Sequence, residues 1–198
     1  CSSDLIEEAP AHQPQLLPGQ VKLKNINGDD KLNEEDMVLI GRNDPKFIFG
    51  FNNNFSYKNF DLNIYMYGQV GKIAGANSYY DAWGSYGNRI KLGQNVPVSF
   101  KDAWSSDNQT STRPSFIESA YGTGDLFLQK ISFLRIRNIT LGYTVPISKS
   151  ICNRLRVYAD INNPCVWTNW KGQDPETDSN TNAYPNVTSF SIGVDISF

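Results

Sequence analysis

Residues 47–69 read FIFGFNNNFSYKNFDLNIYMYGQ, and this stretch decides the fold. Apolar or aromatic residues occupy alternate positions on either side of a polar Lys58-Asn59 pair. The alternating apolar positions are Phe47, Phe49, Phe51, Phe55 and Tyr57, and then Phe60, Leu62, Ile64 and Met66, with Ile48 as the exception on the polar side. A period of two indicates strands with one apolar and one polar face. The stretch therefore predicts an antiparallel hairpin, with strands at about 46–58 and 59–69 and a tight turn at Lys58-Asn59.

The same alternation returns in three later segments, at about 131–145, 153–163 and 188–198. In the first of them the apolar phase shifts by one residue, which predicts a β-bulge near Arg137-Asn138. The last segment places an apolar residue at every other position up to a terminal phenylalanine: Phe190, Ile192, Val194, Ile196 and Phe198. We expect this pattern to be the strand that the outer-membrane assembly machinery recognises. An ordinary amphipathic strand is the alternative.

The lengths of the connections favour a transmembrane barrel over a soluble sandwich. Outer-membrane barrels have short periplasmic turns and long extracellular loops. If the chain ends on the periplasmic side, residues 1–45, 70–130 and 163–187 are all extracellular, and both short turns lie on the opposite side. Five strands cannot close a barrel, since the smallest have about eight. Either more strands lie in residues 1–45 and 70–125, or the chain is part of a larger barrel, and the weak patterning there favours the second interpretation.

Composition excludes several classes of protein. With 18 basic and 20 acidic residues the formal charge is −2, so nothing points to nucleic acid as a partner. Mean hydropathy is −0.44, and no apolar run is long enough for a spanning helix.

We expect Cys152 and Cys165 to lie at opposite membrane faces and not to pair. Cys1 is either the lipidated first residue of a mature lipoprotein or a fragment boundary.

One stretch has the ligand spacing of an EF-hand calcium loop. Oxygen donors at loop positions 1, 3, 5, 7 and 12 are Asn25, Asn27, Asp29, Lys31 (through its backbone oxygen) and Asp36. Asp30 stands where glycine normally permits the sharp turn, and the carboxylate at position 12 is shorter than the usual glutamate. The sequence leaves two interpretations open: a weak calcium site, and a polar loop held by its own side chains.

No catalytic motif is present, and the chain is not predicted to be an enzyme. His12 lies in a Pro/Gln-rich stretch with no visible partner. Asp174 and Glu176 have the chemistry of a glycosidase pair, but Pro175 between them favours a structural turn. Aromatic residues of the expected outer loops could stack on sugar rings, with Trp83, Trp104 and Trp170 as the main candidates. The alternative is that these residues, with Tyr79, Tyr80 and Trp167, form an aromatic girdle or pack loop against loop.

Several segments, in this order, resemble the C-terminal part of SusC/RagA-type TonB-dependent transporters of Bacteroidetes outer membranes. They are PGQVKLKNINGDDKLNEEDMVLIG (18–41), NDPKFIFGFNNNFSYKNFDLNIYMYGQVG (43–71), SFLRIRNITLGYTVP (132–146), LRVYADINNP (155–164), GQDPE (172–176) and SFSIGVDISF (189–198). Residues 1–17 carry no resemblance. The resemblance implies an all-β, antiparallel transmembrane barrel of 22 strands, of which this chain supplies the last five.

The resemblance also implies a function for the whole protein. Transporters of this family import glycans or peptides across the outer membrane, with a SusD-like lipoprotein as a lid and TonB supplying energy through an N-terminal part that these residues do not contain. The expected surroundings are outer-membrane lipid, and no cofactor is implied apart from the possible calcium ion. Two other functions remain open: a glycan-binding surface lipoprotein anchored through Cys1, and a small barrel that stands alone.

Overall fold

The computed structural model describes residues 11–75, 92–93, 95, 98–111, 114–115, 125, 128–147, 152–172, 174–177 and 184–198. The chain divides into two compact units. One comprises Cys1–Gly41 with Ala76–Leu128, and the other comprises Arg42–Gly75 with Gln129–Phe198.

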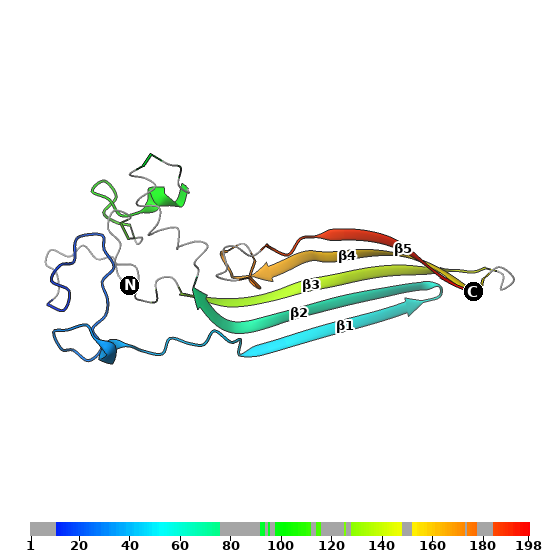
Figure 1. The fold of residues 1–198 in the computed structure, drawn as a ribbon, viewed down its shortest axis with the longest axis horizontal. Helices are drawn as coiled ribbons and strands as arrows, with labels where there is room; N and C mark the ends of the chain where they lie inside the picture. Colours follow the sequence, from blue (N-terminus) through cyan, green and yellow to red (C-terminus); the bar gives the residue numbers. More distant parts are fainter. Residues whose placement is uncertain are drawn as a thin grey trace. The chain divides into compact units, whose positions relative to one another are not determined.

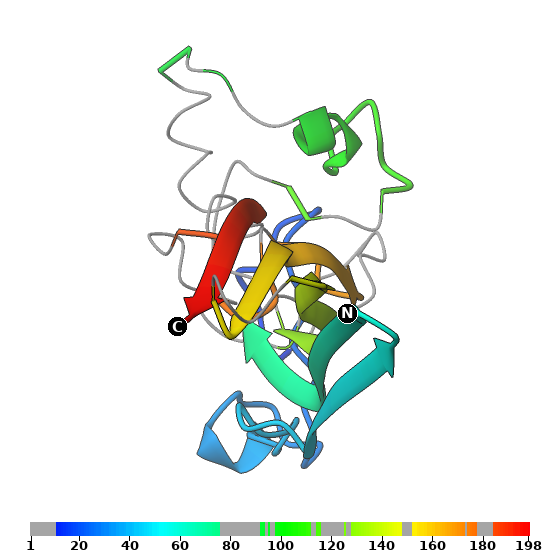
Figure 2. The same ribbon diagram turned by 90° about the vertical axis from the view of Figure 1, so that its right-hand side faces the viewer.

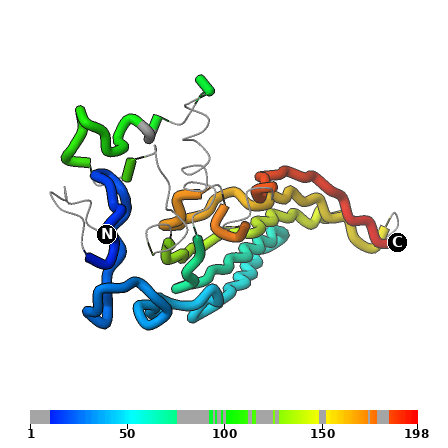
Figure 3. Tube along the Cα trace, turned by 60° about the vertical axis from the view of Figure 1, so that its left-hand side comes forward, coloured from blue at the N-terminus to red at the C-terminus, as the bar shows by residue number. Residues whose placement is uncertain are grey.

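The second unit is built on one antiparallel sheet of five strands in the order of the sequence. The strands are β1 (Phe47–Tyr57), β2 (Phe60–Gly75), β3 (Leu128–Val145), β4 (Arg154–Thr168) and β5 (Ser189–Ser197). They run side by side from cyan to red in Figures 1 and 3. Seen along the strands, the sheet is twisted rather than flat (Figure 2). The all-β, antiparallel fold class is confirmed, and the described residues contain no α-helix.

The β1–β2 turn, the end of β3, the start of β4 and the last residues of β5 lie at the same end of the sheet (Figure 1). The β1–β2 turn reaches the end of β3 through a hydrogen bond from Thr144 N–H to the Asn59 carbonyl, 2.8 Å long. At the start of β4, Asn153 N–H donates to the Ser197 carbonyl over 2.7 Å. The turn itself places Lys58 at φ 53°, in the left-handed region. The end of β2, the start of β3, the end of β4 and the start of β5 lie at the opposite end of the sheet.

A β-bulge interrupts the pairing of β3 with β4. The register shifts between Ile136 and Asn138, where the change of apolar phase predicts it. On β4 the irregularity falls at Asn163, whose φ is 49°. β4 continues past the expected end near residue 163 to Thr168, because its pairing with β3 resumes at Cys165 after Asn163 and Pro164. Likewise β2 runs past residue 69, through Gly71 at φ 83°, to Gly75.

One face of the sheet is apolar and uncovered in the described part of the chain. Strand pairing brings Phe51 opposite Met66, Leu141 opposite Ala159 and Val194 opposite Val157. The exposed apolar side chains of this face include Phe47, Phe51, Phe55, Phe60, Val70, Leu141, Val157, Trp167, Phe190, Ile192, Val194 and Ile196. Their exposed fractions run from 38% at Val157 to 84% at Ile192. Within the described residues, these side chains are not buried in a core.

The first unit follows an irregular path with two short 3₁₀ helices, η1 (Glu34–Asp36) and η2 (Val98–Asp102). The Trp104 ring lies against Gly19, where a Cβ atom would come within 2.3 Å of the indole. Gly19 also accepts a 2.7 Å hydrogen bond from Ser115 N–H through its carbonyl. Across the described residues, no helix has both the length and the apolar character that a bilayer crossing requires.

Candidate functional site

The polar face of the sheet carries the ordered polar side chains of the second unit. Midway along the strands, Asn63 donates to Asn52 and Asn54 over 2.7 and 2.6 Å. On the next two strands, Asn138 of β3 donates to Asn162 of β4 over 3.0 Å. These side chains form a belt of amides across the sheet. Such a belt is compatible with a water-filled interior. Each amide group has donors and acceptors that the bonds between strands do not use and that can bind water.

Near the short-turn end of the same face, an ion cluster links three strands. Arg156 on β4 binds Asp61 on β2 through Nη2 (2.6 Å) and Nε (2.9 Å). Its Nη1 reaches Asp195 on β5 at 3.1 Å. The pair with Asp61 crosses β3 at Gly142, where a Cβ atom would lie 2.4 Å from Arg156 Nη2. The missing side chain at this point of β3 leaves room for the two charges to meet in this geometry.

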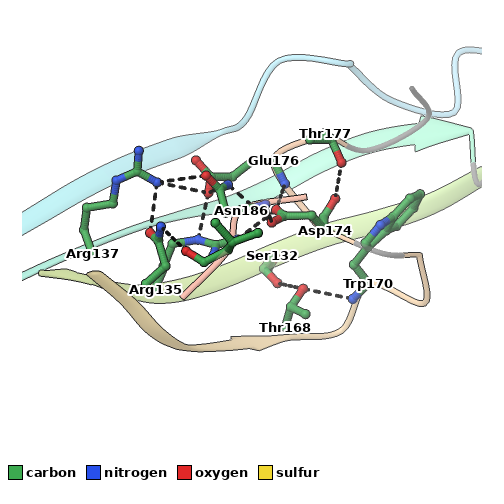
Figure 4. A network of polar contacts seen from close by, with 11 residues as sticks. Ser132, Arg135, Arg137, Thr168, Trp170, Asp174, Glu176, Thr177 and Asn186 are labelled. Carbon is green, nitrogen blue, oxygen red and sulfur yellow. Dashed lines mark hydrogen bonds and ion pairs between the residues drawn. The ribbon is translucent and has the colours of Figure 1, made fainter. Parts of the chain in front are cut away.

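At the opposite end, the residues that follow β4 are bonded back to β3 (Figure 4). Ser132 N–H donates to Asn169 Oδ1 over 2.8 Å, and Asn169 Nδ2 donates to the Lys130 carbonyl over 2.7 Å. The Thr168 hydroxyl donates to the Ser132 carbonyl and accepts from Trp170 N–H, each over 3.0 Å. The connection from β4 to β5, residues 169–188, therefore starts against β3; it is called the anchored loop below.

A buried ion pair holds the middle of the anchored loop. Arg135 Nη2 on β3 lies 2.8 Å from Asp174 Oδ1, with side-chain exposures of 3% and 4%. Asp174 also accepts hydrogen bonds from the backbone N–H groups of Glu176 (2.9 Å) and Asn186 (3.1 Å). Pro175 is fully buried between these partners. The carboxylate is thus fully used by the loop and by β3, which supports the structural interpretation of the GQDPE motif.

Glu176 completes the network around Arg135. Its Oε2 atom lies 2.7 Å from Arg135 Nε, although the two are not aligned as a hydrogen bond, and it accepts from Asn186 Nδ2 at 2.8 Å. Burial raises the pKa of Glu176 above its ordinary 4.5. For Asp174, burial also acts to raise the pKa, but the N–H groups of Glu176 and Asn186 and the guanidinium of Arg135 outweigh it. The pKa of Asp174 therefore lies below its ordinary 3.8.

The anchored loop lies over the polar face of the sheet. Arg135 alternates along β3 with Leu134 and Ile136, which belong to the apolar phase. Phe133 is on the same side as Arg135 and contacts the Tyr67 ring edge-on, with centroids 5.6 Å apart. The burial of Arg135 and Asp174 therefore takes place on the polar side. In a closed barrel this side faces the interior.

The predicted calcium loop is held by its own side chains. Asp36 accepts from Ile26 N–H (2.7 Å) and Asn33 N–H (3.0 Å), and these two groups, Asn33 first, lower its pKa below 3.8. Asn27 donates to Asp29 Oδ2 and to Glu35 Oε2. Asn25 Oδ1 accepts from Gly28 N–H over 2.6 Å, and Lys31 N–H donates to Asp29 Oδ1 over 2.9 Å. No cluster of three or more acidic, His or Cys residues suited to a metal ion occurs in the described ranges. Calcium binding stays a prediction.

The other predicted site residues are dispersed. Trp170 is buried, with its indole Nε1 against Gly172, and Trp104 is half-buried against Gly19. Trp83 and the neighbouring Tyr79 and Tyr80, like Cys1, fall outside the described residues. Trp167 lies on the apolar face and is 55% exposed, as expected of a girdle residue.

His12 contacts the Leu23 carbonyl at 3.2 Å. Cys152 and Cys165 are both free thiols.

The proposed assembly signal lies on the apolar face of β5 and at the residue that follows it. The side chains of Phe190, Ile192, Val194, Ile196 and Phe198 are all more than half exposed.

Sequence reasoning did not single out Arg135, Arg137, Asn186, Asp61 or Arg156 as functional residues. A signal was available, because an arginine inside a half-buried strand must find a partner. The identity of the partner depended on tertiary structure.

Comparison with known proteins agrees with the geometry. The chain is 28% identical over 201 residues to the TonB-dependent receptor P3 of Formosa agariphila, covering 91% of the chain and 19% of the relative. It is 26% identical over 180 residues to the TonB-dependent receptor SusC of Bacteroides thetaiotaomicron, covering 87% and 17%. The chain thus spans about a fifth of the length of these relatives. No family model matches the sequence.

Solved structures give the same result. The RagAB peptide transporter superposes with a TM-score of 0.68 at 26% identity, over 91% of this chain and 20% of that one. The 'open-open' state of the RagAB peptide importer gives a TM-score of 0.67 at 24% identity, over 86% and 19%. These matching proteins are named as receptors and transporters, and none as an enzyme. The exposed apolar face, the sequence relatives and the solved structures together support a barrel segment of a SusC/RagA-type TonB-dependent transporter.

Proposed function

We propose that the chain forms part of the wall of an outer-membrane importer of glycans or peptides. The observation that carries the proposal is the division of the sheet into an uncovered apolar face and a hydrogen-bonded polar face. In lipid, the first supplies the contact with acyl chains and the second lines the interior. The names of the matching proteins, among them SusC and a peptide importer, support the same function.

The orientation follows from the connections. Barrels of the outer membrane have short periplasmic turns and long extracellular loops. The Lys58-Asn59 turn and the connection between β3 and β4 are therefore periplasmic, and the anchored loop is extracellular. β3 has 18 residues, about 60 Å at ~3.3 Å per residue, whereas the apolar band of such barrels is only ~25 Å tall. Even at a tilt of ~45° this length rises ~42 Å, so we infer that β3 extends beyond the membrane on the outer side, within a 22-stranded barrel of a Bacteroidetes-type envelope.

The proposed partners are a SusD-like lipoprotein outside and TonB inside. A solved neighbour of the chain is the two-component RagAB importer, known in 'open-open' and 'closed-closed' states, which supports a lid that opens and closes. Energy from TonB is the expectation attached to the names of the sequence relatives. The chain itself performs no chemistry in this scheme.

The test is made in the native host with the full-length protein. Removing its gene should abolish growth on one defined glycan or peptide source, and removing TonB should give the same loss. A tagged copy should fractionate with the outer membrane and co-purify with a lipoprotein. Recovery in the soluble periplasmic fraction, or palmitate labelling at Cys1 of a 22.2 kDa product, would favour the lipoprotein alternative and overturn the proposal.

A further inference from the structure

The described residues of the anchored loop are bonded to the sheet at both ends of the loop, so the polar side chains that make these bonds have defined positions. Beyond Asp174, its last residues are bonded to the bulge of β4. The Thr188 hydroxyl donates to the Asn163 carbonyl over 2.8 Å, and Asn163 Nδ2 donates to the Val187 carbonyl over 3.1 Å. Side chains held in this way can form a binding site without the cost of ordering a mobile loop.

Arg137 lies where the bulge and the anchored loop meet (Figure 4). The extra residue of the bulge is on β4, where Asn163 and Pro164 stand opposite the single Arg137 of β3. Arg137 therefore has no one-to-one partner in this register, and its guanidinium contacts Asn186 and Glu176 of the anchored loop. Its Nη1 donates to two amide oxygens, those of Asn163 (3.1 Å) and Asn186 (3.2 Å). Amides orient the guanidinium without neutralising it.

The charge of Arg137 is poorly matched in comparison with two other arginines of this face. Arg156 uses Nε, Nη1 and Nη2 on carboxylates, and Arg135 has two carboxylates within 2.8 Å. Among the described residues, the carboxylate nearest to Arg137 is that of Glu176, at 4.0 Å, and its Oε2 atom lies much closer to Arg135. The Arg137 side chain is 43% exposed. Within the part of the chain that the structure describes, its Nε and Nη2 groups make no hydrogen bond.

We propose that Arg137 is a solute-binding residue that receives a carboxylate group at the outer mouth of the barrel interior. The inference rests on the proposed function, since it assumes that the polar face lines the path of a solute. The open Nε–Nη2 edge of a guanidinium matches the two oxygens of a carboxylate in a bidentate pair. Two kinds of solute carry this group: acidic or C-terminally free peptides, and glycans that contain uronic acids.

The experiment measures binding to the purified full-length transporter by calorimetry. Four probes are used: a peptide with a free C-terminus, the same peptide amidated, a uronic-acid tetrasaccharide, and a neutral tetrasaccharide of the same linkage. The wild type should prefer one carboxylate probe over its neutral twin, and which pair shows the preference identifies the source. Arg137→Gln should weaken the preferred probe about tenfold or more and leave its twin unchanged. The affinity of Arg137→Lys for the preferred probe should lie between those of the wild type and Arg137→Gln. Lysine keeps the positive charge but cannot form the bidentate pair.

Lys171→Gln is the matched control, since it removes an exposed cation of the same loop. It should leave all four affinities unchanged. The inference would be overturned if Arg137→Gln weakened binding of a carboxylate probe and of its neutral twin equally. It would also be overturned if the wild type preferred neither carboxylate probe over its twin. Growth in the gene-removal test above is a separate readout, so failure here leaves the importer function standing.

Discussion

Arg156 forms a two-point ion pair with Asp61 although the strands that carry them, β4 and β2, are separated by β3. The pair passes over Gly142, the residue of β3 that lacks a side chain at this level. Sheets are usually stabilised by pairs on adjacent strands. Here one missing Cβ atom allows strands two apart to be held together directly.

Substitution of Gly142 by valine should therefore separate this pair. The new Cβ atom would lie 2.4 Å from Arg156 Nη2 and 2.5 Å from Asp61 Oδ1, so the side chains must move apart. We expect the full-length barrel to lose about 2 kcal/mol of unfolding free energy, typical of overpacking, measured by urea titration. Gly50→Ala is the control, because its nearest contacts would be ordinary ones of 3.7–3.8 Å. Equal stability of Gly142→Val and the control would contradict the assignment.

Loss of the Arg135–Asp174 pair should release the anchored loop. Asp174→Ala leaves a buried guanidinium without its main partner, which costs about 3–5 kcal/mol. The measurement is the rate of trypsin cleavage after Lys171, which we expect to rise strongly. Replacing both partners, as Arg135→Met with Asp174→Leu, should slow cleavage relative to the single change, because no uncompensated charge remains. A double variant cleaved as fast as the single one would show that the ion pair is not what holds the loop.

The same loop should respond to pH in two steps of opposite sign. The pKa of Glu176 is raised above 4.5, so its ionised form weakens the packing of the anchored loop on β3. As the pH falls towards 4.5, protonation of Glu176 should therefore stabilise the packed loop. Because the pKa of Asp174 is lowered, its contribution is complete above 3.8 and is lost as pH falls through the lower value. Hydrogen exchange of the loop amides should pass through a maximum of protection in acid. Glu176→Gln should remove the first step alone, and Asp174→Asn should remove the second.

The 25–36 loop should keep its shape without calcium, since Asp36 and the asparagines already bind the loop's own N–H groups. If calcium binds, two neutral asparagines at the first ligand positions limit the affinity to about 10⁻⁴–10⁻³ M. Calorimetry with the full-length protein measures this affinity, and Asp36→Ala should abolish the heat. Micromolar binding would show that the loop rearranges around the ion.

Two neighbouring residues of β5 test the membrane face directly. Ile192 is 84% exposed on the apolar side, while Ser191 is on the polar side opposite Asp160. Arginine at position 192 should destabilise the barrel by about 2–4 kcal/mol if the residue is near the bilayer midplane. Arginine at position 191 should cost much less, because it faces water and an acidic neighbour. Similar losses in folded, heat-modifiable protein for the two variants would remove the basis for a lipid-facing surface.

The strands and their two faces could be predicted because each depends on local alternation, as in Phe47 to Tyr57. The ends of β2 and β4 were missed where Gly71 and Asn163 interrupt the pattern without ending the strand. The anchored loop was beyond prediction for another reason. Arg135 and Asp174 are 39 residues apart, and only the packing of the loop on β3 brings them into contact.

The positions of β1 and β5 as outermost strands have a practical consequence. Each presents, along one side, backbone groups that no neighbour in the described sheet satisfies. Produced without its flanking strands, such a sheet would be prone to join copies of itself edge to edge into insoluble aggregates. Recombinant work should therefore start from inclusion bodies of a longer polypeptide, refolded in detergent.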